Sequence, residues 1–486
     1  MSNAITNLEP KAVWENFYNI CQIPHPSEHE EAIRAFFIEF GKKHNLETKV
    51  DKTGNIVISK PATKGMENRQ GVVLQGHMDM VPQKNSDKNH DFTKDPITTI
   101  IDGEWVRADG TTLGADNGMG VAASMAVLQS TTIEHGPIEV LITSNEETGM
   151  DGAFGLESGW LKGDILMNLD SEDEGELYVG CAGGEDATIS FQFEKEAVPA
   201  GSKAFKISLT GLKGGHSGVD IHLQRGNANK LMNRFFNLIG QETDLRIANI
   251  EGGSLRNAIP RESFAIVTVP ESKVALLKES VISYYETISA EFKTVEPEMQ
   301  MKIEPADAPA FVIDKNTQKR FIAAIYACPN GVVRMSDDMK GLVETSNNLA
   351  IIKFNDNKIE TCCLMRSSVD SAKLDLQQAV KSVFELAGAN IQFEGAYPGW
   401  KPNLDSKILK TMLELYKTKY GVTPEIRAIH AGLECGLLSG AYPNWDLISF
   451  GPTIRFPHSP DEKVNIASVV KFWDFLVETL KNVPVK

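Results

Sequence analysis

The stretch Gly71-Val-Val-Leu-Gln-Gly-His77-Met-Asp79-Met80 joins a short apolar run to two ionisable side chains. The run at 72–74, bounded by glycines, predicts a buried strand. His77 and Asp79 are two residues apart, so on an extended chain they point to the same side. We expect His77 to bind a metal ion and Asp79 to orient its ring from behind. The alternative is a solvated pair in a loop.

Length and composition narrow the class of protein. A chain of 486 residues is too long for one core, so we expect two or more domains. A net charge of −16 argues against nucleic acid or an anionic membrane as partner. The six cysteines contain no CxxC pair and are typical of reduced thiols in a cytoplasmic protein. No secretion signal or membrane span is expected.

The first part of the chain alternates strands with helices. Two helices are expected within residues 10–44, with Ser27 in an N-cap arrangement before the second. Asp116 lies just before a helix at 121–129. Further strands are expected in segments 50–59, 97–101, 105–108, 138–147 and 164–170. Acidic residues follow several of these strands, which favours an open α/β sheet with a site at its carboxyl edge.

The pattern changes near residue 187 and changes back near 400. Paired strands and helices between these points form two successive units, which suggests an α+β insert with an internal pseudo-repeat. The α/β pattern then returns to the C-terminal helix at 465–481. We therefore expect one α/β domain, residues 1–186 and 400–486, interrupted by a second domain, 187–399.

Ionisable residues gather at the predicted strand ends. They are His77, Asp79, Asp116, Glu146, Glu147, Asp170 and His458. Each alone has a plain explanation; Asp116, for example, could be a helix N-cap. Together they would place several like charges on one edge of a sheet, where they repel strongly unless cations neutralise them.

The types of side chain point to a catalytic metal site. Imidazole and carboxylate without thiolate suit Zn²⁺, Mn²⁺ or Co²⁺ in an open site. Two histidines and three acids suffice for two ions that share one carboxylate, about 3.5–4 Å apart, and such a pair acidifies a shared water. Glu146 and Glu147 would point opposite ways on a strand, so one can bind metal while the other faces that water.

Several motifs resemble the dinuclear-zinc exopeptidase superfamily, which includes carnosinases, aminoacylases, glutamate carboxypeptidases and tripeptidases. They are His77-x-Asp79, Gly-Ala-Asp116-Asn-Gly, Glu146-Glu147-x-Gly, Asp170 and His458. Longer strings along essentially the whole chain resemble one branch, the bacterial aminoacyl-histidine (Xaa-His) dipeptidases. They are IPHPS, DFTKDPI, GTTLGADNG, GMDGAFGL, GLKGGHSG, LRNAIPRE, GAYPGW and IHAGLECG.

The resemblance implies a division of the metal ligands. Asp116 would bridge two ions, His77 and Asp170 would complete one site, and Glu147 and His458 the other. The ions would be zinc, with cobalt or manganese as alternatives.

The resemblance also implies the catalytic roles and the fold. Glu146 would be the general base, and Asp79 would support His77. The peptide bond from Asp116 to Asn117 would be cis. The fold would be a catalytic domain interrupted by an α+β lid domain.

Four further residues are implied as substrate-binding groups. His216 would stabilise the oxyanion, and Asn257 would contact substrate. Arg366 offers a guanidinium fork to a terminal carboxylate. The string His430-Ala-Gly-Leu-Glu434-Cys-Gly would be a substrate-binding loop, in which Glu434 could receive the substrate amine. Without the resemblance, His216 could lie in a turn, Asn257 could cap a strand end and Arg366 could be solvated. Related enzymes are dimers whose neighbouring subunit supplies the histidine, so we expect a homodimer.

The resulting hypothesis is a metal-dependent dipeptidase that prefers Xaa-His substrates, including β-alanyl-histidine. A water between the metals would attack the peptide carbonyl, with Glu146 taking its proton. The alternatives are an N-acyl amino-acid deacylase or tripeptidase with the same metal centre, or a non-catalytic homologue. The presence of Glu146 favours an enzyme.

Overall fold

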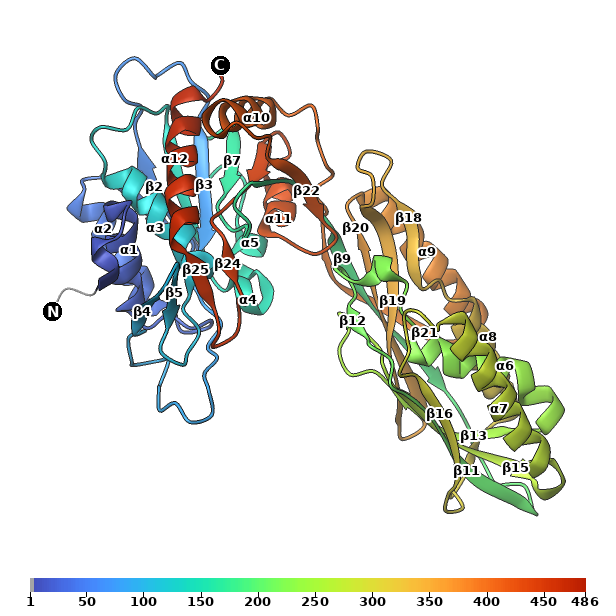
Figure 1. Cartoon of the computed structure of the whole chain (residues 1–486). Helices are drawn as coiled ribbons and strands as arrows, with labels where there is room; N and C mark the ends of the chain where they lie inside the picture. The colour runs from blue at the N-terminus through green and yellow to red at the C-terminus, as the bar shows by residue number, and fades with distance from the viewer. Residues whose placement is uncertain (1–3) are drawn as a thin grey trace. The chain divides into compact units, whose positions relative to one another are not determined.

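A computed structural model describes residues 4–486, apart from the side chain of Gln241. The chain divides into two compact units, which are shown in Figure 1. The first holds the chain up to Gly180, Pro402–Ala428 and Leu433–Lys486; the second holds Cys181–Lys401 and Ile429–Gly432. These divisions differ by a few residues from the boundaries expected at 186/187 and 399/400. The sequence did not indicate that 429–432 belongs to the second unit.

The first unit is built on an eight-stranded sheet of order β1-β2-β6-β3-β7-β23-β8-β22. Its central strands are parallel: β3 (Val72–His77) pairs with β6 (Ile138–Thr143) and β7 (Ile165–Asn168), and β7 pairs with β23 (Asp446–Ser449). The outer strands are β1 (Glu47–Val50), β2 (Ile56–Lys60), β8 (Glu176–Cys181) and β22 (Glu425–Ile429). Because parallel strands end at one edge, the residues after β3, β6 and β7 converge there. The expected α/β class is confirmed.

Small residues bring one helix of this unit close to the strand ends. α3 (Ala115–Gln129) is almost wholly buried and packs on β3 and on α1 (Lys11–Cys21). A Cβ added at Gly120 would lie 2.4 Å from the carbonyl oxygen of Leu169, so only glycine permits this approach. The contact places the start of α3 beside the end of β7.

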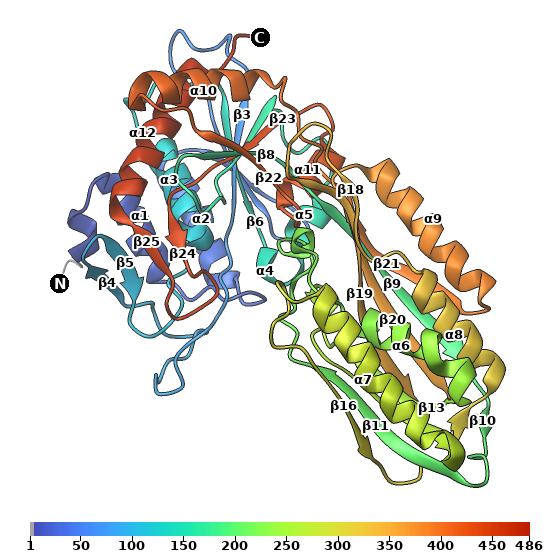
Figure 2. The same ribbon diagram turned by 45° about the vertical axis from the view of Figure 1, so that its right-hand side comes forward.

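Further helices lie around the sheet (Figure 2). They are α2 (Glu31–Lys43), α4 (Glu146–Gly149), α5 (Asp151–Gly155), α10 (Lys407–Tyr420), α11 (Glu434–Ala441) and α12 (Ile466–Asn482), with a 3₁₀ turn at Ala4–Asn7. A separate four-stranded sheet has the order β24-β25-β5-β4. Its strands are β24 (Ile454–Arg455), β25 (Lys463–Asn465), β5 (Trp105–Ala108) and β4 (Thr99–Asp102). Within the described residues, no helix combines the length and apolarity required to cross a bilayer.

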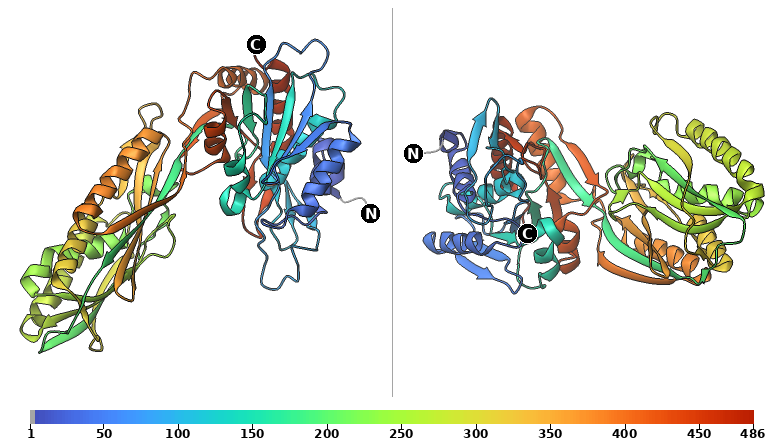
Figure 3. Two further views of the ribbon diagram at one scale, coloured as in Figure 1. Left: turned by 180° about the vertical axis from the view of Figure 1, so that it is seen from behind. Right: turned by 90° about the horizontal axis from the view of Figure 1, so that it is seen from below.

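The second unit contains a nine-stranded antiparallel sheet with four long helices on one face (Figure 3). Eight strands follow the order β16-β11-β15-β13-β19-β20-β9-β21, and β18 pairs with β19. Their bounds are β9 (Gly183–Gln192), β11 (Ser202–Thr210), β13 (Arg246–Gly252), β15 (Ser263–Pro270), β16 (Gln300–Pro305), β18 (Gly331–Met335), β19 (Val343–Asn355), β20 (Lys358–Ser367) and β21 (Asn390–Tyr397). The helices are α6 (Ala228–Thr243), α7 (Val274–Glu291), α8 (Lys315–Ala327) and α9 (Asp370–Leu386). Buried aromatic and aliphatic residues fill the core, among them Phe191, Phe235, Phe321 and Phe384.

The sheet consists of two equivalent halves. One half has the chain order β11-α6-β13-β15-α7-β16, and the other has β9-α8-β19-β20-α9-β21. They meet where Gly252 of β13 pairs with Ile352 of β19. The predicted pseudo-repeat is therefore present, but the prediction of two successive units is wrong. In the sequence, the first half lies between β9 and α8 of the second half. β9 belongs to the second half because it pairs with β20 and not with β11, the next strand of this sheet along the chain.

Candidate metal centre

His77 is the last residue of β3 and is almost completely buried. Its Nδ1 lies 3.0 Å from the carbonyl oxygen of Asp79 and 3.4 Å from Oδ1 of that residue. Its Nε2 faces two acids, 3.1 Å from Asp116 Oδ1 and 3.4 Å from Asp170 Oδ1. If Nδ1 donates its proton to the Asp79 carbonyl, Nε2 is left with a lone pair that can bind a cation.

Asp116 lies between the two histidines. Its Oδ2 is 3.3 Å from Nε2 of His458, whereas its Oδ1 faces His77. The peptide bond from Asp116 to Asn117 is cis, as the resemblance implied, and both residues have non-helical dihedral angles within the first turn of α3. The two carboxylate oxygens of Asp116 thus point to different partners.

His458 connects Asp116 to one of the paired glutamates. Its Nε2 lies 3.0 Å from Glu147 Oε2, and about half of its side chain is exposed (51%). Ligand atoms from these residues form three groups in which all atoms lie within 4.8 Å of one another. The groups are His77–Asp116–Asp170, His77–Glu146–Glu147 and Asp116–Glu147–His458. The structure therefore brings together the five expected metal ligands and the expected base.

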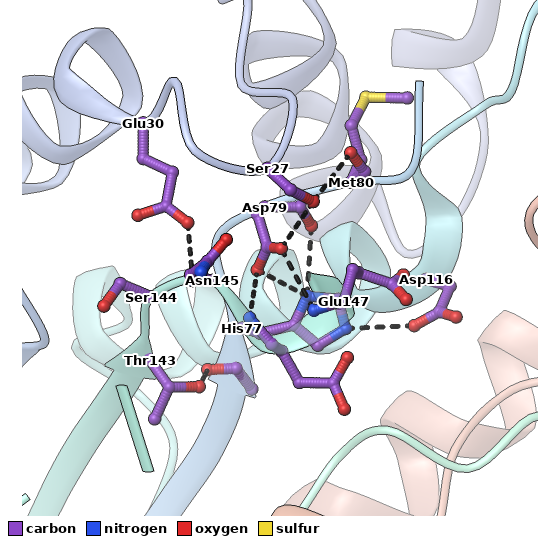
Figure 4. A network of polar contacts seen from close by, with 12 residues as sticks. Ser27, Glu30, His77, Asp79, Met80, Asp116, Thr143, Ser144, Asn145 and Glu147 are labelled. Atoms are coloured by element: carbon purple, nitrogen blue, oxygen red, sulfur yellow. Dashed lines mark hydrogen bonds and ion pairs between the residues drawn. The ribbon is translucent and has the colours of Figure 1, made fainter. Parts of the chain in front are cut away.

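Asp79 holds more than the His77 ring (Figure 4). Its Oδ1 accepts the backbone N–H of Glu146 at 2.9 Å, and its Oδ2 accepts that of Glu147 at 3.2 Å. The Ser27 hydroxyl also donates to Oδ2, at 2.8 Å. The predicted N-cap role of Ser27 is wrong: α2 begins at Glu31 without a side-chain cap. Ser27 instead braces the carboxylate that anchors both glutamates.

The paired glutamates do not lie on a strand, so the predicted strand alternation is wrong. β6 ends at Thr143, and Asn145 adopts a left-handed conformation (φ 52°) before the short helix α4 begins at Glu146. The backbone N–H of Asn145 donates to Glu30 Oε1 at 2.5 Å. The turn is thus held by acids from other elements, which sequence alternation cannot reveal.

The electrostatics of the cluster reflect its crowded acids. Burial raises the pKa of Glu146 well above its ordinary value, and the charges of Asp170, Glu434 and Glu147 add to the effect. Burial together with the charge of Asp116 raises the pKa of Asp170 to about 8. Hydrogen bonds to Asp116 and Glu147 raise the pKa of His458 to about 11. The protonated His458 ring therefore balances part of the negative charge of these acids.

Orphaned carboxylate oxygens fit a cation. Within the described part of the chain, Glu147 Oε1 and Asp170 Oδ1 are buried and accept no hydrogen bond. Buried acceptors are rarely left without a partner. A set of imidazole and carboxylate donors is suited to Zn²⁺, Co²⁺ or Mn²⁺. The residues that carry these oxygens, Asp170 and Glu147, belong one to each of the two ligand groups that share Asp116.

Glu434 is placed differently from the sequence expectation. It begins helix α11 instead of lying in a loop, and it is buried. Its Oε2 accepts hydrogen bonds from Gln75 Nε2 at 2.5 Å and from Thr143 Oγ1 at 2.8 Å, whereas its Oε1 has no partner among the described residues. Burial raises its pKa to about 7.

The other three expected substrate residues belong to the second unit. His216 Nδ1 accepts the backbone N–H groups of Gly218 and Val219, at 3.2 and 3.1 Å, so the proton of the neutral ring is on Nε2. Arg366 is buried, not solvated. Its guanidinium donates to the hydroxyls of Ser217 at 3.5 Å and Tyr397 at 3.2 Å, and it forms no ion pair with a described carboxylate. Asn257 is exposed and its carbonyl oxygen accepts the N–H of Ser217 at 2.8 Å.

Of two further residues, His430 was named from the sequence only as the start of the expected loop, and Glu462 was not singled out. His430 is buried in the second unit, with Nε2 2.7 Å from Ser346 Oγ, and burial together with the charge of Arg366 lowers its pKa to about 3. Glu462 is buried in the first unit and accepts N–H groups from the segment that ends in Asp116. The only signal for Glu462 was an acidic residue four positions after His458.

Comparison with known proteins finds relatives that match this chain over nearly its whole length. The chain is 50% identical to the cytosol non-specific dipeptidase of Escherichia coli (strain K12), over 99% of both chains. It is 54% identical to the crystal structure of aminoacylhistidine dipeptidase from Vibrio alginolyticus, with a TM-score of 0.95, covering 100% of this chain and 99% of that one. The aminopeptidase PepT structure from Bacillus cereus shares the fold, with 16% identity, a TM-score of 0.58 and coverage of 98% and 99%.

A family model matches residues 73–482, from the middle of β3 to the end of α12. That range contains all the residues of the three ligand groups. The chain therefore belongs to peptidase family M20/M25/M40.

Proposed function

We propose that this protein is a dipeptidase that uses two divalent metal ions and cleaves Xaa-His and other dipeptides. The observation that carries the proposal is the pair of ligand groups sharing Asp116, on a chain half identical to a dipeptidase over its full length. One relative is named a non-specific dipeptidase and the other an aminoacylhistidine dipeptidase, so the proposed substrates include Xaa-His and other dipeptides.

The two ions would be zinc, with cobalt or manganese as alternatives. His77, Asp116 and Asp170 would hold one ion, and Asp116, Glu147 and His458 the other. When bound, such ions polarise a carbonyl and lower the pKa of a water molecule towards about 7. They would also relieve the repulsion among the acids of the cluster.

Glu146 is the candidate general base. Its carboxyl lies in the group with His77 and Glu147, and Asp79 fixes its backbone. Burial and neighbouring acids favour its protonated form. A carboxyl with a raised pKa is a stronger base once it is ionised, so it can take a proton from the attacking water and return it to the leaving amine. Asp79 would act through position, by holding His77 and the turn that carries both glutamates.

Four further side chains are the candidate substrate-binding groups. Buried Arg366 lacks a carboxylate partner, which suits the terminal carboxylate of a dipeptide. The Nε2–H of His216 can donate to a carbonyl oxygen as it gains negative charge. Asn257 would contact the peptide. The free Oε1 of Glu434 suits the substrate ammonium group.

The substrate test compares Ala-His with three close analogues. We expect turnover of Ala-His and Ala-Ala, and much slower turnover of N-acetylhistidine, which lacks the amine, and of Ala-Ala-His. A Glu434→Gln variant should raise KM for Ala-His while leaving metal content unchanged, because it removes the charge that would face the amine. Preferential hydrolysis of N-acetylhistidine would instead indicate a deacylase, and preferential hydrolysis of Ala-Ala-His a tripeptidase.

We also propose a homodimer in which His216 acts on the site of the partner subunit, a proposal that rests on the family resemblance. Mixing Glu146→Ala chains with His216→Ala chains, under conditions that exchange subunits, should restore activity. Each mixed dimer would then have one site with both groups intact. Inactive mixtures proven to contain mixed dimers would refute sharing.

The cytoplasm is the proposed location. The Escherichia coli relative is named a cytosol enzyme, and all six cysteines are buried thiols, as a reducing compartment allows. Fractionation of cells that express the natural gene would test this assignment.

A further inference from the structure

One buried carboxylate outside the ligand groups accepts four consecutive backbone N–H groups. Glu462 Oε2 lies 2.7 Å from the nitrogen of Leu113 and 3.0 Å from that of Gly114. Its Oε1 lies 2.8 Å from the nitrogen of Ala115 and 3.2 Å from that of Asp116. The side chain is only 2% exposed, so these bonds are protected from water.

The segment that donates these N–H groups has no cap of its own. Helix α3 begins at Ala115, and its N-cap residue Gly114 has a left-handed φ of 72° and no side chain to accept a hydrogen bond. The first N–H groups of a helix lack partners within the helix and carry partial positive charge. The Glu462 carboxylate satisfies them from far away in the sequence. The last residue that it holds is Asp116, whose carboxylate faces both histidines.

The other end of this contact is the turn that carries His458. The backbone N–H of Glu462 donates to the carbonyl oxygen of Ser459 at 3.0 Å, which closes a tight turn directly after His458. The next residue, Lys463, begins β25 and pairs with Arg107 of β5. The His458 ring is half exposed (51%), so little packing holds it directly. Its position therefore depends on this turn.

We infer that Glu462 is a positioning residue that clasps the segment ending in Asp116 to the turn beginning at His458. The clasp sets the ligand spacing of the Asp116–Glu147–His458 group. His77 and Asp170 come from the ends of β3 and β7, so their spacing does not depend on Glu462. This inference rests on the proposed function, because it takes these residues as metal ligands.

The test is a zinc titration of the metal-free, full-length protein against a chromophoric chelator. Glu462→Gln keeps the shape of the side chain, but its amide nitrogen cannot accept the N–H groups on its side. Wild type should bind two zinc ions. In the variant, the weaker ion should lose roughly 10- to 100-fold in affinity, the usual effect of removing a group that orients ligands, and the tighter ion should change less. Equal affinities in variant and wild type would overturn the inference.

Glu172→Gln is the matched control for charge. The Glu172 carboxyl acts electrostatically on Asp116, Asp170 and His458 but accepts none of the four N–H groups. If it weakens zinc binding as much as Glu462→Gln does, the effect is one of charge and the clasp is rejected. Wild type binding fewer than two ions would instead reject the proposed metal centre.

Hydrogen exchange tests the clasp without any variant, should Glu462→Gln fail to fold. In metal-free wild type, the amides of 113–116 should exchange slowly, at least as slowly as those later in α3. Rapid exchange of these amides would overturn the inference, because an intact clasp protects all four.

Discussion

The ligand groups His77–Asp116–Asp170 and Asp116–Glu147–His458 share Asp116 but are constructed in different ways. His77 is the last residue of the buried parallel strand β3 and is 1% exposed, and Asp170 lies two residues after the end of the buried parallel strand β7. Glu147 lies on the four-residue helix α4, and His458 lies in a half-exposed turn with a left-handed φ of 59°. The first group inherits its geometry from the sheet. The second requires carboxylates from elsewhere, Asp79 and Glu462, to hold its loops in place.

Removing the metals should have the largest effect. Exhaustive chelation should abolish hydrolysis of Ala-His, and added Zn²⁺, Co²⁺ or Mn²⁺ should restore it. Because the His458 group is the more exposed of the two, its ion should leave first, which gives a species with one ion. Metal content and activity measured during stepwise chelation would show this. Full activity in metal-free protein would refute the metal centre.

The two glutamates of α4 should separate chemistry from metal binding. Glu146→Gln should lose about 100- to 10,000-fold in kcat and keep both ions, because it removes the proton acceptor and leaves both ligand groups that share Asp116 intact. Glu147→Gln, the matched control, should lose metal affinity as well. Elemental analysis alongside kcat distinguishes the two. Near-normal kcat for Glu146→Gln would assign the base to another residue.

Asp79 should affect both groups at once, because it contacts the His77 ring and the N–H groups of Glu146 and Glu147. Asp79→Asn should weaken both ions by roughly 10- to 100-fold. Ser27→Ala, which removes only one hydrogen bond to that carboxylate, should have a smaller effect. Zinc titration of the metal-free proteins gives both values. If only one ion were weakened, Asp79 would serve one group alone.

The pH dependence of the metal-free protein is the smallest predicted effect. The pKa of His458 is raised to about 11 from its ordinary 6.5, so its stabilisation is complete below about pH 6.5 and is lost as pH rises towards 11. The pKa of Asp170 is raised to about 8 from 3.8, so its ionisation opposes folding increasingly from about pH 4 to 8. Both groups therefore lower the stability of the folded, metal-free protein as pH rises.

The Tm of metal-free protein should therefore fall between about pH 6 and pH 9. The zinc-loaded protein should show a smaller fall over that range, because bound metal replaces the protons. His458→Asn should reduce the slope for the metal-free protein and serves as the control. A Tm that rises with pH in metal-free wild type would contradict the prediction.

The parts of this protein that sequence determined are those governed by local periodicity and motif. The apolar run before His77 predicted β3, and the alternation of strands and helices predicted the α/β class. The motifs also singled out the residues that the structure gathers into the three ligand groups, since motif spacing is a property of the chain alone.

Tertiary structure decided what depends on partners far apart in sequence. The turn after β6 placed Glu146 and Glu147 on a helix, because Asp79 and Glu30 accept its N–H groups. Ser27 became a brace for Asp79 instead of a cap. The nesting of the two halves of the second unit follows from the pairing of β9 with β20. Hydrogen-bond partners hundreds of residues apart leave no periodic signal, so only the folded chain reveals that Glu462 caps the helix that carries Asp116.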